Sequence, residues 1–353
     1  MSSSRIPSLD GIRALSILLV LASHFGLSLH YPHYLWAVAN CYGKVGLRIF
    51  YVLSGFLITG LLLRERRRTG TISLRNFYMR RAYRILPAAY LYMIIITIMC
   101  HADFRTRDVA FAFTYLSAYS TYIPHNLSHL WSLSVEEQFY LLWPAVMAVA
   151  ALRERWVAVG VALVAPVVRL VLITAGWNNG PLFPMATSVD ALAVGCLLAL
   201  TQDILEKWRA RFTHSCFWLV WVLTALLPLV ELAGHGRIYQ TVVLPLLHVG
   251  IALCIQNAIL MRYRVLNASA PVWIGNISYS LYLWHRPFDE PSGHSWYATF
   301  PANLILMFGA AVSSYYFVEQ PMLKLRDRWL PKVFRSDVNH PVEIGAASVL
   351  PET

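Results

Sequence analysis

The sequence is poor in charged residues. Asp, Glu, Lys and Arg together make up 13% of the 353 residues, whereas hydrophobic residues make up 58% and the mean hydropathy is +0.53. Soluble domains carry roughly 25% charged residues. This composition argues against a soluble enzyme, a disordered chain and a disulfide-rich secreted domain.

Cysteine is also scarce, with five residues in the whole chain. No two of them stand in a CxxC pair, so the sequence predicts neither a disulfide framework nor a cysteine metal site. A bridge between Cys41 and Cys100 is the one pairing that stays open. We expect no bound metal.

Long runs of apolar residues make up much of the sequence. A membrane-spanning helix needs about 20 mostly apolar residues, and ten segments qualify. They predict an all-α polytopic membrane protein, with a single integral-membrane domain over 1–335 and a short polar tail over 336–353. The ten segments lie near 12–29, 45–63, 85–101, 135–152, 156–175, 182–201, 216–233, 240–261, 270–287 and 298–317.

The positive charges orient these segments. Lys and Arg of membrane proteins gather in cytoplasmic loops, and here the basic groups concentrate in every second connection, above all within 64–84. This pattern predicts that both termini are cytoplasmic. It also indicates that residues 109–123 lie at the outer surface or re-enter it, because an eleventh crossing would move the later basic loops outside. The net charge of +11 is thereby explained without nucleic acid as a partner.

Several ionisable residues lie inside the apolar segments, where each is costly and therefore a candidate for function. Their positions place them in one layer toward the outer surface, which predicts a shared polar site. His24 is the candidate base, and Arg13, eleven residues earlier, shares its helix face at 3.6 residues per turn. The members of the layer are His24, Arg48, Glu136, Glu137, Arg169, Asp190, His285 and Arg286.

A second group of arginines lies in the predicted cytoplasmic loop over 64–84. Arg80 and Arg84 are four residues apart, so on a helix they project together. A pair of guanidinium groups at a membrane surface suits a ligand that carries phosphate. The alternative, favoured for 64–68, is a topogenic signal that faces anionic lipid.

The local sequences resemble the membrane acyltransferase 3 family. Six stretches carry the resemblance, in order along residues 7–322. They are Pro7–Ser16 with His24, Phe50–Thr59, Phe77–Pro87, His129–Tyr140, Gly275–His285 and Val318–Pro321.

The resemblance implies a multi-pass enzyme of the bacterial cytoplasmic membrane. Such an enzyme moves an acyl group, usually acetyl, from acyl-CoA to a hydroxyl of a saccharide, lipid-linked glycan or glycoside, with acyl-CoA (acetyl-CoA) as a substrate and no permanently bound cofactor. The family's residues fall on Arg13 and His24, on Arg81 and Arg84 with Arg80 beside them, and on Glu136 with Glu137 next to it.

An expected reaction follows. His24 would remove the proton of the acceptor hydroxyl, because imidazole titrates near neutral pH, and Glu136 would orient its ring. Direct attack is preferred to an acyl-histidine intermediate. The CoA phosphates would bind Arg80, Arg81 and Arg84, while Arg13, Glu137 and Arg48 would support catalysis. Arg48 and Ser54 are the candidates for stabilising the oxyanion.

Three other functions compete with this one. A transporter or flippase for a saccharide precursor would use the outer layer as its binding site, but the sequence shows no internal repeat. A pH-sensing receptor would leave the cytoplasmic arginines without a purpose. The other large class of membrane O-acyltransferases has an Asn and His pattern that the sequence lacks.

Overall fold

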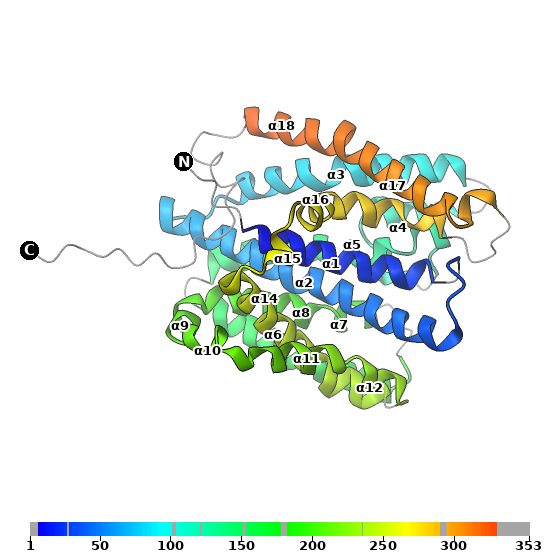
Figure 1. The fold of residues 1–353 in the computed structure, drawn as a ribbon. Coiled ribbons are helices and arrows are strands. Elements are labelled where there is room, and N and C mark those ends of the chain that lie inside the picture. Colours follow the sequence, from blue (N-terminus) through cyan, green and yellow to red (C-terminus); the bar gives the residue numbers. More distant parts are fainter. Residues whose placement is uncertain are drawn as a thin grey trace, which may run out of the picture.

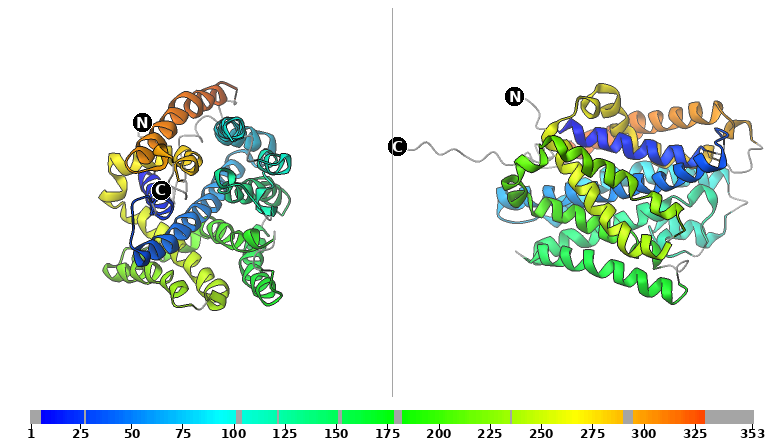
Figure 2. Two further views of the ribbon diagram at one scale, coloured as in Figure 1. Left: turned by 90° about the vertical axis from the view of Figure 1, so that its right-hand side faces the viewer. Right: turned by 60° about the horizontal axis from the view of Figure 1, so that its bottom comes forward.

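The computed structural model of this chain is entirely helical in the residues that it describes. The helices lie side by side in one bundle, with their axes in roughly one direction (Figures 1 and 2). The predicted all-α class is therefore confirmed. The predicted tail over 336–353 and the end of the predicted domain lie outside the described residues, which are 6–26, 28–100, 104–120, 122–150, 153–177, 182–234, 236–289 and 295–329.

Among the described residues, seven helical segments are long and apolar enough to cross a membrane, and they establish a multi-pass membrane protein. Two of them, α2 (His33–Thr69) and α3 (Leu74–Met99), are continuous and longer than predicted. The others are α6 (Glu154–Thr174), α7 with α8 (Phe183–Ala186 and Val189–Leu200), η4 to α12 (Ser215–Leu232), α13 to α14 (Gly236–Met261) and α17 to α18 (Ala302–Trp329).

The three remaining predicted spans also coincide with helices. These are α1 (Pro7–His24), α5 (Leu130–Val149) and α16 (Ser269–Trp284). They are not among the seven segments that qualify as spans by length and composition. The total of ten spans and the orientation of the termini thus stay predictions.

The predicted long loop over 64–84 is wrong. Helix α2 continues to Thr69 and α3 begins at Leu74, so residues 70–73 alone connect them. Arginine is a good helix former, and the helix ends only where Gly70 adopts a left-handed φ of 78°. The Ser73 side chain then caps α3 by accepting from the backbone N–H of Asn76. The arginines therefore stand on helix ends.

The described residues of the segment 109–123, which are 109–120 and 122–123, contain no spanning helix. They hold most of α4 (Thr106–Phe113) and the single turn η2 (Ser117–Tyr119). The 8 residues of α4 measure about 12 Å, less than half of a hydrocarbon core. The other short elements are η3 (His125–Leu127), α9 (Gln202–Lys207), α10 (Arg209–Phe212), α15 (Arg264–Asn267), η6 (Arg286–Phe288) and η7 (Trp296–Ala298).

Helix α1 packs against both α2 and α16 in the middle of the bundle (Figure 1). A glycine permits the close approach of α16, because a Cβ at Gly275 would lie 1.9 Å from the backbone oxygen of Asp10. Small residues serve this purpose at helix contacts in membranes. The contact brings the end of α1, with His24, beside the end of α16.

The periphery of the bundle differs from its centre. Helices α11 (Trp218–Leu226) and α12 (Leu229–Leu232) form an edge in Figure 1, and only 6% of the apolar stretch over 215–232 is buried. For α6 the buried share is 22%. These helices present apolar side chains outward, as a lipid-facing surface requires.

Candidate functional site

The polar groups predicted to form one layer separate into three sets according to their contacts. One surrounds His24, one surrounds Glu136, and one joins Arg169 to Asp190. The expectation of a single shared site was therefore wrong. Depth along the membrane fixes one coordinate of a residue, whereas the helix on which it stands and the face it occupies fix the other two.

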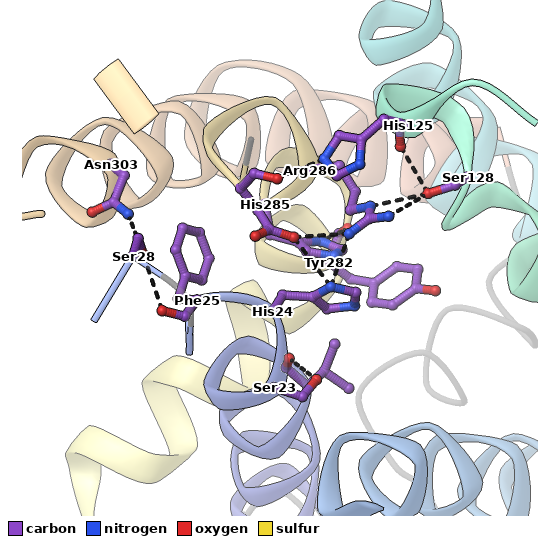
Figure 3. Close-up of polar contacts among 12 residues, drawn as sticks. Ser23, His24, Phe25, Ser28, His125, Ser128, Tyr282, His285, Arg286 and Asn303 are labelled. Atoms are coloured by element: carbon purple, nitrogen blue, oxygen red, sulfur yellow. Dashed lines mark hydrogen bonds and ion pairs between the residues drawn. The ribbon is translucent and has the colours of Figure 1, made fainter. Parts of the chain in front are cut away.

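His24, the last residue of α1, contacts two charged groups that follow α16 (Figure 3). Its Nδ1 lies 2.9 Å from Nη1 of Arg286 and 3.2 Å from Oδ2 of Asp289. Arg286 Nη1 also donates to Asp289 Oδ2 at 2.8 Å. The His24 side chain is 33% exposed, and those of Arg286 and Asp289 are 14% and 12% exposed. We call these three residues the His24 set.

The segment before α5 holds this set in place. Nε and Nη2 of Arg286 donate to Ser128 Oγ at 3.0 and 2.7 Å. His125 Nε2 lies 2.6 Å from the backbone oxygen of Asp289. Burial, followed by the nearby Arg286 guanidinium, lowers the pKa of His125, so its ring is neutral at neutral pH and donates this hydrogen bond.

Two buried histidines lie behind His24. The ring of His285 is 4.8 Å from that of His24 and 5.1 Å from that of His129, between centroids. Tyr282 lies next to both histidines. Its hydroxyl donates to the backbone oxygen of His129 at 3.0 Å and forms a hydrogen bond with the Ser132 hydroxyl. Tyr282 and Ser132 in turn line a cavity of the protein.

The Glu136 set lies in that cavity, whose volume is about 510 Å³. Glu136 Oε1 accepts hydrogen bonds from Ser54 Oγ and, at 3.0 Å, from Tyr140 OH. His24 is not among the lining residues. The expected pairing of Glu136 with His24 is therefore wrong, and the carboxylate in contact with His24 is Asp289. Glu137 does not line the cavity either.

The arginines expected to bind the donor line the same cavity. Arg81, Arg84 and Arg13 are part of its wall, and the Arg81 guanidinium lies 3.9 Å above the Tyr140 ring. Arg80 also lines it, but it forms a buried ion pair of 2.6 Å with Glu65. A ligand would have to compete with that carboxylate, so Arg80 is the least suited of them to bind phosphate.

The third set, which we call the Asp190 set, is closed to solvent. Arg169 Nη2 donates to Asp190 Oδ2 at 2.6 Å, and His248 Nδ1 lies 3.2 Å from the same oxygen. All three side chains are 0–1% exposed. Arg48 donates instead to the backbone oxygen of Thr187 at 2.6 Å, in the break between α7 and α8.

Sequence reasoning missed several residues of these sets. Asp289 lies beyond the end of a predicted span, so the search for charges inside spans passed over it. His248 lies inside a span and should have been found by that search. Glu319, which accepts from Ser280 Oγ and lines the cavity, belongs to one of the six stretches that carry the family resemblance. The sequence therefore pointed to Glu319, but no role was predicted for this residue.

Comparison with known proteins agrees with the resemblance. Residues 6–319 match the model of a family described as an acyltransferase domain. The chain is 29% identical to the peptidoglycan O-acetyltransferase OatA of Listeria monocytogenes, over 92% of this chain and 56% of that protein. It is 28% identical to the putative peptidoglycan O-acetyltransferase YrhL of Bacillus subtilis, over 90% of this chain and 55% of that protein.

A third relative is the O-acetyltransferase OatA of Staphylococcus aureus, with 29% identity over 90% of this chain and 57% of that protein. The chain thus spans about half the length of the curated relatives that it matches. No solved structure matches it.

Proposed function

The chain belongs to the membrane acyltransferase 3 family, and on that premise we propose that it is an O-acetyltransferase that moves acetyl from acetyl-CoA to a saccharide hydroxyl. The observation that carries the proposal is the cavity of about 510 Å³, whose wall combines Arg13, Arg81 and Arg84 with Glu136. Guanidinium groups match phosphate oxygens in geometry and charge. A CoA molecule carries such phosphates at one end and the reactive thioester at the other.

The orientation in the membrane belongs to the same proposal. Ten helices would cross the bacterial cytoplasmic membrane with both termini inside, so that the arginines at the end of α2 and the start of α3 face the cytoplasm, where acyl-CoA is made. The positive-inside pattern of the sequence supports this orientation. His24, at the far end of α1, would then face the outer side.

His24 is the proposed base. It would take the proton of the acceptor hydroxyl while the hydroxyl oxygen forms a bond to the acyl carbon, the C–S bond breaks, and the proton passes to the CoA thiolate. Ring contacts join the cavity wall to His24, because Tyr282, which lines the cavity, lies 5.4 Å from His285 between ring centroids, and His285 contacts the His24 ring. Glu136, with Ser54 and Tyr140, would act on the cavity side of these contacts, on the arm of the donor that carries the thioester toward His24.

The acceptor class is inferred from the relatives. Two of them are named for peptidoglycan, so we propose a cell-wall or surface glycan as the acceptor of this chain. The partly exposed His24 ring supports this choice, because a polymeric acceptor requires a base that it can reach from the surface.

A comparison of cell-surface glycans tests this function. Mass spectrometry would be applied to glycans from wild-type cells, a deletion strain, and deletion strains that express the wild type or His24→Ala. We expect an acetyl ester that is lost on deletion and restored by the wild type alone. Unchanged acetylation in the deletion strain, together with a change in the amount of exported glycan, would favour a transporter instead.

A further inference from the structure

A carboxylate and a guanidinium compete for one nitrogen of the His24 ring. Nδ1 lies 3.2 Å from Asp289 Oδ2 and 2.9 Å from Arg286 Nη1. A neutral imidazole carries one proton, on Nδ1 or on Nε2. A protonated Nδ1 donates to Asp289, whereas an unprotonated Nδ1 accepts from Arg286. The two neighbours therefore favour opposite tautomers.

We propose that Asp289 is the positioning residue that makes His24 a base. By accepting from Nδ1–H, Asp289 leaves the lone pair on Nε2 free for the acceptor hydroxyl, and it stabilises the imidazolium that forms when Nε2 takes the proton. This inference rests on the proposed function, in which His24 is the base. It replaces Glu136 in the orienting role with a residue that directly contacts the ring.

The position of Asp289 suits this role because two contacts restrain it. Its backbone oxygen accepts from His125, and its carboxylate accepts from Arg286, which is itself held by Ser128. A restrained carboxylate can fix the rotation of a ring, whereas a mobile one would follow it. Asp289 is joined in this way to the segment before α5 as well as to the end of α16.

The other groups around His24 are basic. His285 contacts its ring, and Arg286 approaches Nδ1. His129 lies behind His285, and His125 lies beyond Asp289. Among the described residues, Asp289 is thus the acid that contacts His24, and the surrounding groups are His125, His129, His285 and Arg286.

Arg286 acts in two ways on this arrangement. It orients Asp289 through one hydrogen bond at 2.8 Å, and it offers an N–H to Nδ1 that opposes the productive tautomer. Removing the guanidinium should therefore increase the share of Nδ1–H. Removing the Asp289 charge should decrease it, because an asparagine amide can donate to Nδ1 and stabilise the wrong tautomer.

Steady-state kinetics of the purified full-length protein with acetyl-CoA and soluble peptidoglycan oligosaccharides give the first test. We expect Asp289→Asn to lower kcat on the order of 10²- to 10⁴-fold, with the KM for acetyl-CoA nearly unchanged. Asp289→Glu should recover part of the loss. The matched control is Glu231→Gln, which should keep the wild-type kcat. It removes a carboxylate that pairs with Lys44 at 2.5 Å and does not belong to the His24 set.

Nitrogen NMR of histidine-labelled protein gives the second test and requires no activity. The His24 signal is assigned by its absence in His24→Gln, at a pH where the ring is neutral. We expect the share of Nδ1–H to fall in Asp289→Asn and to rise or stay high in Arg286→Gln. Each variant is first checked for a wild-type elution profile in detergent, and Asp289→Ala, which also removes the carboxylate, replaces Asp289→Asn if the latter aggregates.

The outcomes separate this inference from the proposed function. If His24→Ala is inactive while Asp289→Asn keeps the wild-type kcat and tautomer, the positioning role of Asp289 is wrong and the function stands. If His24→Ala itself transfers acetyl at the wild-type rate, the proposed function of His24 fails. An unchanged tautomer in Asp289→Asn overturns the inference whatever the kinetics show.

Discussion

Two of the three sets of polar side chains in this bundle, the Asp190 set and the His24 set, differ most in burial. In the Asp190 set, Arg169, Asp190 and His248 are 0–1% exposed and contact one another. In the His24 set, the side chains of Asp289, Arg286 and His24 are 12%, 14% and 33% exposed. Both contain a histidine, an arginine and an aspartate. A molecule from outside can reach only one of them.

This difference assigns separate roles to the two sets. A fully buried ion pair has no access to substrate, and breaking it leaves an unpaired charge in the interior. A partly exposed histidine between an acid and a cation can exchange a proton with a ligand. We therefore expect changes in the Asp190 set to affect stability and changes in the His24 set to affect activity.

The largest expected effect is that of His24→Ala. Loss of the base should lower acetyl transfer on the order of 10²- to 10⁴-fold, while the melting temperature in detergent stays near that of the wild type. Transfer from acetyl-CoA and thermal unfolding would be measured on the same preparation. A well-folded His24→Ala protein with wild-type transfer would remove the distinction between the two sets.

The second prediction concerns the Asp190 set. Asp190→Asn leaves Arg169 buried without its counter-charge, which should cost about 3–5 kcal/mol of stability. The matched control is Glu231→Gln, which breaks the more exposed ion pair with Lys44 and should cost less than about 1 kcal/mol. Thermal unfolding of both variants measures the difference. An Asp190→Asn protein of normal stability that has lost transfer would place this set in the catalytic machinery.

The third prediction compares two adjacent carboxylates. Glu136 lines the cavity and accepts from Ser54 and Tyr140, whereas Glu137 does not line it. Glu136→Gln should lower the rate roughly 10- to 100-fold, since it removes charge-assisted hydrogen bonds, and Glu137→Gln should lower it less. Matched kinetic assays of the two variants decide the order, and the reverse order would show that Glu137 is the functional acid.

The smallest expected effect concerns the helix contact that places His24. A Cβ at Gly275 would lie 1.9 Å from the backbone oxygen of Asp10, so Gly275→Ala must separate α1 from α16 and should cost about 1–3 kcal/mol. Gly309→Ala is the control, because a Cβ there meets no atom within 4 Å. Melting temperatures of the two variants measure the effect. Equal temperatures would mean that this close approach is not needed.

The sequence predicted the fold class and the helical segments well, because long apolar runs are a strong signal in membrane proteins. It failed where neighbours in space decide the outcome. The pairing of His24 with Asp289 joins residues 265 positions apart, and no local pattern encodes it. The grouping of Arg169 with the outer layer failed for the same reason. The position of a residue along an apolar segment gives its depth in the membrane, but it does not show which neighbouring helix its side chain faces.

The arginine-rich ends of α2 and α3 show a second limit. Composition predicted a basic cytoplasmic region, but it could not show that Arg80 forms an ion pair with Glu65 although it lines the same cavity as Arg81 and Arg84. A single acid, fifteen residues away in sequence, separates a structural arginine from two candidate ligands for phosphate. Pairing of this kind depends on how the connection over residues 70–73 orients α3 relative to α2.

The central claim is that donor binding and proton removal take place in different regions, and acetyl-CoA titration of two variants in detergent tests it most directly. The account predicts that Arg81→Ala with Arg84→Ala weakens acetyl-CoA binding roughly 10- to 100-fold, because hydrogen bonds between charged groups are lost. His24→Ala should bind acetyl-CoA as tightly as the wild type. Wild-type binding by the double arginine variant, or lost binding in His24→Ala, would contradict the account.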